Sequence, residues 1–199
     1  MVVQTLPIQT SEKHYTKDQF FDLSRFFDMT YQYELREGLI YKMPPPSMLP
    51  SMIAARIIVY IGNYLLEHDI GHLTGADGAY ELNNDNTLEP DVGFISYENQ
   101  ALAKETGFVP KAPDLAVEVI SPYDSKSQTQ DKAEVYLSAG TKLVWIVYPK
   151  SETVDVCRLT ENKTMKITEM TKDDMLSGED VLPDFTLAIK NVFAVKKTD

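Results

Sequence analysis

The strongest constraint on the fold is a strand–helix–strand unit in the middle of the chain. Residues 114–120 (DLAVEVI) and 142–149 (KLVWIVYP) are short apolar runs, which is typical of strands buried on both faces. Between them, SPYDSKSQ supplies a turn and a helix start, and QDKAEVYLSAG predicts a helix that ends at Gly140. Two strands joined by such a crossover pair in parallel, with a right-handed connection. We therefore expect an α/β protein.

Two further helices are predicted in the N-terminal third. The first covers residues 17–29, with Thr16 as its N-cap. Its apolar side chains recur near helical spacing, so we expect core packing from Phe20, Phe21, Leu23, Phe26 and Phe27. The second helix spans roughly residues 50–68, is rich in Ile, Ala and Leu, and ends before Gly71.

The remaining elements are predicted to be strands. Residues 31–43 indicate a β-hairpin that turns at Glu37-Gly38, and a run of prolines at 44–46 then breaks the chain. Alternation and β-branched residues predict four more strands, with the Asn/Asp-rich NNDNT as a turn between the first two. We place these strands at 73–82, 91–96, 153–159 and 164–170, before a short C-terminal segment around Phe185 to Phe193.

Length and composition indicate one domain. The chain has 199 residues, of which 43% are hydrophobic, enough for one sizeable core, with residues 1–15 expected to be flexible. The apolar stretches fall short of the ~20 residues that a membrane span needs, so we expect no membrane association and a cytoplasmic location. A single cysteine, Cys157, allows no internal disulfide and no cysteine zinc cluster, and we expect it to pack in a strand.

Net charge argues against broad, charge-driven affinity for nucleic acid. The chain has 19 basic and 30 acidic residues, a formal charge of −11. A nuclease is still compatible with this charge, because acidic metal sites add negative charge and Mg²⁺ can bridge carboxylates to phosphate. A local basic strip would require folding to gather Lys104, Lys111, Lys126 and Lys132.

Two acidic residues stand in apolar strands and carry the chemical signal. Glu118 lies inside LAVEVI, and Asp91 follows Pro90 at the head of the strand Val92 to Ile95. An unpaired buried charge is costly, so each carboxylate must find a cation, become protonated or reach the edge of a sheet. Each alone could be a hydrogen-bonded structural acid. Together, on neighbouring strand ends, they favour a hard-oxygen site for Mg²⁺ or Mn²⁺.

Several of these segments resemble one family over nearly the whole chain. The similar segments are Glu34-Leu35 through Gly38, Glu89-Pro90-Asp91-Val92, Val117 to Pro122 with Asp124, Asp131-Lys132, Tyr136, Ala139-Gly140, Val144 to Val147, Leu176-Ser177-Gly178 and Leu182 to Phe185. In combination they are similar to the Uma family of restriction endonuclease-like proteins, within the PD-(D/E)XK nuclease superfamily.

The resemblance implies a restriction endonuclease-like fold: a central mixed β-sheet flanked by α-helices, with an N-terminal helix and β-hairpin. It also implies that Asp91 and Glu118 are metal ligands for phosphodiester hydrolysis. The superfamily pattern has a lysine two residues after the glutamate, where strand alternation puts both side chains on one face. Here that residue is Ile120. Lys132 matches the family's recurrent lysine and is our candidate for a migrated catalytic lysine, with Lys126 as second choice.

Other roles stay open for the candidate residues. Lys132 next to Asp131 and near Glu134 could equally be a solvated residue on its helix. Glu34 matches a family acid that could approach the site, or it could pair with Arg36 or another exposed base. Asp124 could be an extra ligand, but a turn or capping role is simpler in Ser-Pro-Tyr-Asp-Ser.

The resemblance has one departure besides Ile120. Family members commonly carry a histidine at the start of the second helix, where this chain has Pro50-Ser51. Two functions of different class therefore remain. One is a Mg²⁺- or Mn²⁺-dependent nuclease that acts on nucleic acid, DNA rather than RNA, as a homodimer in keeping with the superfamily. The other is a weak or inactive pseudo-nuclease that binds a nucleic-acid or protein partner.

Overall fold

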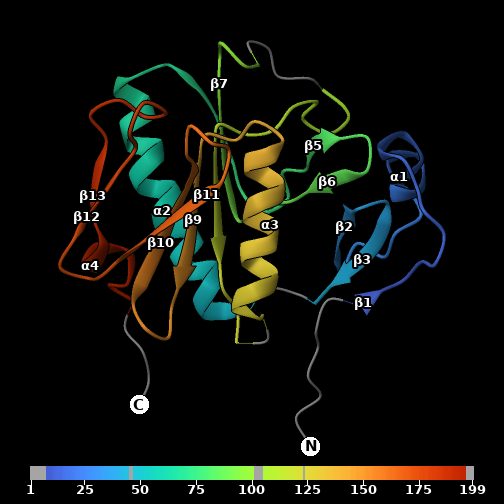
Figure 1. Cartoon of the computed structure of the whole chain (residues 1–199), viewed down its shortest axis with the longest axis horizontal. Helices are drawn as coiled ribbons and strands as arrows, with labels where there is room; N and C mark the ends of the chain where they lie inside the picture. The colour runs from blue at the N-terminus through green and yellow to red at the C-terminus, as the bar shows by residue number, and fades with distance from the viewer. Residues whose placement is uncertain (1–7, 45–46, 101–104, 123, 196–199) are drawn as a thin grey trace, which may run out of the picture.

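The computed structural model describes residues 8–44, 47–100, 105–122 and 124–195. Its central sheet has six strands in the order β11-β10-β9-β8-β7-β4 (Figure 1). β8 and β9 pair in parallel and the other neighbours are antiparallel, so the sheet is mixed. In chain order the strands are β4 (Gly71–Thr74), β7 (Val92–Ser96), β8 (Leu115–Val119), β9 (Leu143–Tyr148), β10 (Thr153–Leu159) and β11 (Met165–Met170).

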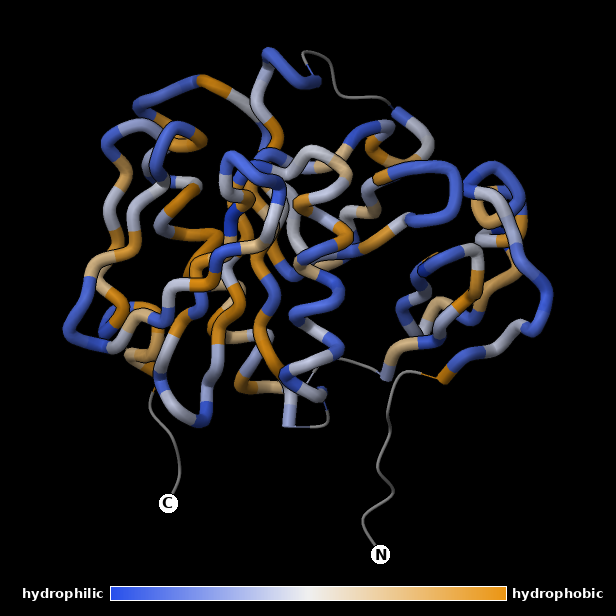
Figure 2. Tube along the Cα trace, viewed as in Figure 1, coloured by the Kyte–Doolittle hydropathy of each residue, from blue (hydrophilic) through white to orange (hydrophobic). Residues whose placement is uncertain are grey.

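Two long helices cover opposite faces of this sheet. α3 (Lys126–Ser138) connects β8 to β9, which confirms the strand–helix–strand unit, and Gly140 follows it at φ 111°. Its buried side chains pack with Ala116 and Ile146, whereas α2 (Met48–Glu67) packs with Val117 and Trp145. Alternation along β8 therefore directs odd-numbered side chains to α2 and even-numbered side chains, including that of Glu118, to α3. Figure 1 shows α3 and α2 on either side of the sheet, and Figure 2 shows the hydrophobic residues concentrated along the central strands.

A second sheet is built mainly from the N-terminal segment, in the order β1-β3-β2-β6-β5. The predicted hairpin is confirmed: Glu37 and Gly38 both take positive φ, 50° and 77°, as a tight turn between paired strands requires. Thr87 pairs with Leu35, and this pairing joins the N-terminal strands to the segment before β7. The strands are β1 (Ile8–Gln9), β2 (Gln32–Arg36), β3 (Leu39–Met43), β5 (Tyr80–Asn83) and β6 (Asn86–Leu88).

The first helix is shorter than predicted. α1 (Lys17–Ser24) begins at a capping box formed by Thr16 and Gln19, as the sequence indicates. It ends at Ser24, where turns replace the expected last turn and a half of helix. Phe20 is buried in a small cluster under β2 and β3, but Phe26 is 78% exposed, so its predicted core position is wrong.

The predicted strand at residues 73–82 is also wrong as a single element. Its first part is the end of β4 in the central sheet, and its last part is β5 in the second sheet. Turn residues 75–78 separate the two, and a Cβ at Gly78 would lie 2.6 Å from Thr74 Cβ. The predicted NNDNT turn tightens to Asn84-Asp85, because its last residues belong to β6.

The C-terminal segment completes the α2 side of the core. β12 (Met175–Ser177) pairs with β13 (Thr186–Ala188), and α4 (Ile189–Val192) follows directly. The side chain of Cys157 is fully buried in β10, in agreement with the predicted packing role. Residues 1–7, which form the first half of the segment expected to be flexible, lie outside the described residues, whereas β1 pairs with β3.

The expectation that every apolar stretch is too short to span a membrane is wrong for α2. This helix has 20 residues and is long and apolar enough to cross a membrane by length and composition, and 28% of its most apolar 18-residue stretch is buried. Four of its side chains are buried in the core cluster at the sheet, and five more pack partly buried against that cluster, while Met48, Met52, Val59 and Leu66 are exposed. Much of its apolar surface therefore faces away from the core.

Candidate active site

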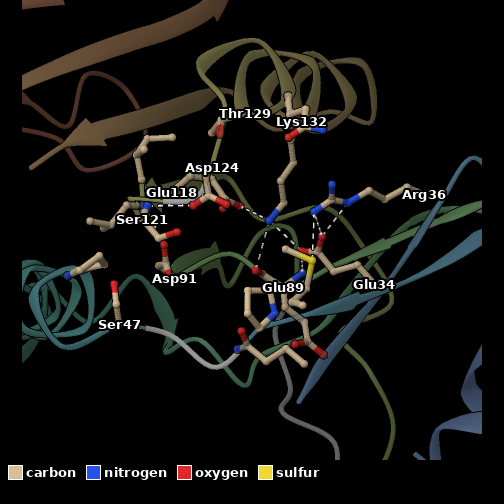
Figure 3. Close-up of a pocket in the computed structure, with 17 residues that line it drawn as sticks. Glu34, Arg36, Ser47, Glu89, Asp91, Glu118, Ser121, Asp124, Thr129 and Lys132 are labelled. Carbon is tan, nitrogen blue, oxygen red and sulfur yellow. Dashed lines mark hydrogen bonds and ion pairs between the residues drawn. The ribbon is translucent and has the colours of Figure 1, made fainter. Parts of the chain in front are cut away.

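The ends of β7 and β8 bring the two predicted carboxylates together. Val92 pairs with Val117 in the antiparallel register, so Asp91 lies beside Glu118. Opposite residues in antiparallel strands present their side chains on the same face. Both side chains line one pocket, as Figure 3 shows. The structure thus places the predicted pair on adjacent strand ends.

Asp91 is fixed by the backbone of the neighbouring strand. Its Oδ2 accepts a hydrogen bond from the Val119 amide at 2.6 Å. Burial raises the pKa of Asp91 to about 6, and the nearby charges of Asp124 and Glu34 act in the same direction. Within the described residues, no hydrogen bond or ion pair involves its Oδ1, which leaves that oxygen available to a ligand.

Glu118 is buried on the α3 face of the sheet and is held by two residues of that helix. Its Oε1 lies 2.7 Å from Lys132 Nζ and accepts a hydrogen bond from the Tyr136 hydroxyl at 2.9 Å. Lys132 and Tyr136 are four residues apart, so they project from the same side of α3. Burial raises the pKa of Glu118 to about 7, with a further contribution from Asp91.

Lys132 points into the pocket and not into solvent. Its side chain is 8% exposed, and its Nζ lies 2.7 Å from both Glu118 Oε1 and Glu34 Oε1. The Glu89 carbonyl oxygen lies 3.5 Å away. Burial alone would lower the pKa of Lys132, but the charges of Glu118 and Glu34 outweigh it and raise that pKa above its ordinary value. The ammonium therefore stays charged in a nearly dry setting.

Glu34 anchors the other side of the lysine. Its Oε2 pairs with the Arg36 guanidinium, whose Nε donates at 2.8 Å, and its Oε1 accepts from the Glu89 amide at 3.0 Å and contacts Lys132. Although burial opposes it, the Arg36 and Lys132 charges lower the pKa of Glu34 to about 2. Both oxygens of Glu34 are thus occupied, so the structure places it as a partner of the lysine. The predicted pairing with Arg36 is observed along the same strand.

The remaining predicted residues lie at different distances from this centre. Asp124 lines the pocket, and its Oδ2 accepts a hydrogen bond from the Ser121 amide at 2.8 Å, which is a turn role. The predicted helix cap is Ser125 instead, whose side chain accepts from the Gln128 amide. Lys126 instead has a 56% exposed side chain that lies 3.4 Å from Asp155 Oδ2 and over the Tyr148 ring. The second-choice lysine is therefore engaged elsewhere.

Two members of the predicted basic strip, Lys126 and Lys132, do not form a common basic surface. Lys126 and Lys132 start from the same helix but contact different acids, Asp155 and Glu34. Lys104 lies outside the described residues. No continuous basic surface along α3 follows from these positions.

Sequence reasoning missed several residues of the site. Tyr136 donates a hydrogen bond to Glu118, and burial raises the pKa of Glu89 to about 8. Ser47, the N-cap of α2, also lines the pocket, and its buried Oγ has no hydrogen-bond partner among the described residues. The i, i+4 spacing of Lys132 and Tyr136 on a helix packed against a Glu-bearing strand was an available signal. The Ser47 position was not, since it depends on where α2 begins.

The donor set fits a hard divalent cation but is sparse. No group of three or more His, Cys, Asp or Glu residues that could hold a metal ion occurs in the described part of the chain. Asp91 and Glu118 nevertheless supply two adjacent carboxylates, each with one oxygen free of the protein contacts given above. Mg²⁺ commonly binds through one or two carboxylates, with water and substrate phosphate as further ligands. The residues present are compatible with that mode.

A mixed sheet flanked by two helices, with acidic residues on adjacent strand ends and a buried lysine on the crossover helix, defines the restriction endonuclease-like class. The chain belongs to the Uma2 family, because the family model described as "Uma2: Putative restriction endonuclease" matches residues 18–190. The family resemblance and the fold class predicted from the sequence are thus confirmed.

One solved structure with a similar fold is "a putative nuclease belonging to DUF820" from Anabaena variabilis ATCC 29413. The two structures superpose with a TM-score of 0.73 at 22% sequence identity, over 90% of this chain and 97% of that chain. At this identity the likeness supports the fold. No curated protein matches the chain.

Proposed function

We propose that this protein is a divalent-metal-dependent nuclease in which Asp91 and Glu118 bind the metal and Lys132 is the catalytic lysine. The observation that carries the proposal is the position of Lys132 Nζ, 2.7 Å from Glu118 Oε1 in the pocket that Asp91 also lines. The family assignment supports a nucleic-acid substrate. Membership in a nuclease-like family and a buried lysine beside paired carboxylates point to the same chemistry.

The oxygen-only donor pair favours Mg²⁺ or Mn²⁺ as the cofactor. When bound, such an ion would offset the negative charge of a phosphodiester and increase the acidity of water. The protein's own contribution is to present Asp91 in a fixed orientation, through the Val119 amide, and Glu118 through Tyr136. Both fixed carboxylates reduce the reorganisation that ligand binding requires.

Lys132 would stabilise negative charge that develops on the phosphate, or orient the attacking water. Its ammonium lies between two carboxylates in a site with little solvent, where electrostatic interactions are strong. Since Glu34 is also paired with Arg36, it holds the lysine without taking part in metal binding. Glu34 is therefore a positioning residue in this proposal.

DNA is the substrate we propose, with RNA as the alternative that the experiment below distinguishes. The net charge of −11 disfavours long-range attraction of either polyanion. Binding would then depend on the divalent ion, which can bridge the protein carboxylates to a phosphate. We accordingly expect weak association with nucleic acid when divalent ions are absent.

Two observations favour the alternative of a pseudo-nuclease. Ile120 occupies the position of the superfamily lysine, and the charge of Lys132 is compensated by both Glu34 and Glu118. A fully neutralised lysine gives less stabilisation to a phosphate than one with a single partner. In that case the protein would retain the fold and a binding role, with little or no turnover.

Cleavage assays on matched variants test the proposal. Supercoiled plasmid, linear duplex DNA and single-stranded RNA would be incubated with the protein in Mg²⁺, Mn²⁺ or a chelator. We expect cleavage of DNA that requires the divalent ion and falls at least about 100-fold in Asp91→Asn and Lys132→Met proteins. Asp124→Asn is the control, because the new amide oxygen still accepts the Ser121 hydrogen bond. Folded wild-type protein that cleaves none of these substrates would favour the pseudo-nuclease.

A further inference from the structure

The outer face of α2 carries an apolar stripe that runs the length of the helix. The buried residues of α2 face the sheet, and the stripe lies on the opposite side. Its members recur at alternating intervals of four and three residues, which is the spacing by which one helix packs along another. They are Met48, Met52, Ala55, Val59, Gly62 and Leu66. Met48, Val59 and Leu66 are 74%, 58% and 85% exposed.

Gly62 is the least expected member of this stripe. Glycine in the interior of a helix is less stable than alanine, so it usually marks a close approach of another group. Among the described residues, a Cβ at position 62 would meet only Leu73 Cδ2, at 3.9 Å, which is ordinary contact. The chain itself therefore leaves room for a side chain there. A helix that approaches from outside would explain the glycine.

The stripe is self-complementary when a second copy of the helix packs against it in the opposite direction. If two copies of α2 pack antiparallel about a two-fold axis level with residue 57, Met52 lies opposite Gly62 and Ala55 opposite Val59. Each of these larger side chains then faces a smaller one, as close packing of two helices requires. A shallow hollow at the middle of the helix, lined by residues 55, 56, 59 and 60, could receive the partner's Val59.

The same two-fold axis also brings residues of like polarity opposite each other outside those central pairs. Met48 would lie opposite Leu66, which are two of the most exposed hydrophobic side chains of the chain. Ser51 and Asn63, both exposed polar residues beside the stripe, would lie opposite each other at its rim. The pairing thus has an apolar centre with polar edges, which is the usual composition of a protein interface.

We propose that α2 is a homodimerisation surface, on which the α2 of a second copy packs antiparallel through this stripe. The stripe contains no charged residue, whereas the whole chain has a net charge of −11. Two copies would repel each other through most surfaces, and an uncharged stripe minimises that repulsion. Because the two copies present identical surfaces, only a self-complementary pattern closes such a contact.

A membrane surface is a less suitable partner for the same stripe. Amphipathic helices that lie on membranes carry several Lys or Arg residues beside the apolar face. α2 has one basic residue, Arg56, whose Nε donates to the Asn191 carbonyl oxygen at 3.0 Å. With a net charge of −11, the chain would also be repelled by anionic lipid.

The size of the stripe sets the expected strength of the dimer. From residue 48 to residue 66 a helix extends about 27 Å, and the stripe with its rim offers roughly 500 Å² per copy. This is at the low end for a specific interface, so we expect a concentration-dependent dimer. Because Ser47 at the start of α2 lines the candidate active site, the two sites would lie at opposite ends of the helix pair, about 30 Å apart.

Sedimentation velocity over a range of concentrations tests the surface. We expect the wild-type protein to shift from monomer toward dimer between about 1 and 300 μM, and Val59→Glu to weaken the dimer at least about tenfold. Met29→Glu is the matched control, because Met29 is 89% exposed and lies outside α2, so its dimerisation should equal that of wild type. Thermal melts establish that both variants are folded.

Cysteine cross-linking tests the antiparallel register. The native Cys157 is fully buried, so single-cysteine variants at the surface report on one position each. A mixture of Ala55→Cys and Val59→Cys proteins should form a disulfide dimer faster than either protein alone, since like positions are offset by about 6 Å along the axis. Self-cross-linking that equals or exceeds mixed cross-linking would overturn this register.

Two other results would overturn the homodimer itself. One is a wild-type protein that remains monomeric throughout the concentration range. The other is flotation of wild-type protein with phosphatidylcholine–phosphatidylserine vesicles that Val59→Glu abolishes, because the stripe would then be a membrane contact. Neither result bears on the proposed nuclease activity, which the cleavage assays measure separately.

Discussion

At the scale of single residues, Lys132 links two carboxylates from two different sheets. Glu118 lies on β8 of the central sheet, Glu34 lies on β2 of the second sheet, and Lys132 Nζ is 2.7 Å from each. A buried lysine with two buried partners contributes to the fold as well as to the proposed chemistry. The two roles can be separated, because they respond differently to substitution.

Replacement of Lys132 by methionine should destabilise the protein. The substitution leaves Glu118 and Glu34 buried without their shared cation, and loss of one partner from a buried ion pair costs about 3–5 kcal/mol. Urea unfolding, monitored by circular dichroism, measures this change. Lys132→Arg should lose less stability than Lys132→Met, because it keeps the charge. Equal stability of wild type and Lys132→Met would mean that the ion pairs are not formed in solution.

The Glu34 carboxylate should make stability depend on acid pH. Its pKa in the folded protein is about 2, below the ordinary value of 4.5, because Arg36 and Lys132 stabilise the charged form. A depressed pKa gives stability that is fully present above pH 4.5 and is lost as the pH falls toward 2. In Glu34→Gln protein this contribution is absent at every pH.

The comparison of wild type with Glu34→Gln therefore isolates this residue. We expect the difference in unfolding free energy between the two proteins to shrink by about 2 kcal/mol from pH 6 to pH 3, from urea titrations at each pH. A difference that stays constant over this range would contradict the depressed pKa.

At the scale of elements, the hairpin β2–β3 positions Glu34 and Arg36 over α3. Its turn places Gly38 at φ 77°, and a Cβ there would lie 2.8 Å from His14 Nδ1. Gly38→Ala should destabilise the protein through both backbone strain and this close contact, by about 1–3 kcal/mol. Gly140→Ala is the matched control, because Gly140 has φ 111° and no atom of the described residues lies within 4 Å of the added Cβ. A smaller loss for Gly38→Ala than for Gly140→Ala, measured by thermal unfolding, would contradict this reasoning.

Sequence patterns correctly predicted the elements whose structure is determined by local sequence alone. The β8–α3–β9 unit and the β2–β3 hairpin rest on apolar runs and on one turn, and both are observed. The failures are elements that tertiary contacts decide. Residues 73–82 alternate like one strand, but the chain turns at 75–78 and delivers the two halves to different sheets. Phe26 has helical spacing, yet α1 ends at Ser24, before that residue.

At the scale of the whole molecule, the candidate site lies where the two sheets meet at α3. The sequence indicated Asp91 and Glu118 because a carboxylate buried in an apolar strand is costly in free energy unless it has a partner. The family resemblance indicated Lys132. The sequence offered Glu34 as an acid that could approach the site or pair with Arg36, but it could not show that Glu34 does both, since β2 lies far from Lys132 in the chain and reaches the site through the second sheet. Nor could it locate Ser47, whose position depends on the packing of α2.

Calorimetric titration of Mn²⁺ into metal-free protein tests the central claim most directly. Asp91→Asn and Asp124→Asn proteins are compared with wild type, because both acids line the pocket but Asp124 holds a turn through the Ser121 amide. The account predicts that wild type and Asp124→Asn bind one Mn²⁺ per chain with similar affinity, and that Asp91→Asn loses this binding. Equal binding by all three proteins, or binding by none of them, would contradict a metal site built on Asp91 and Glu118.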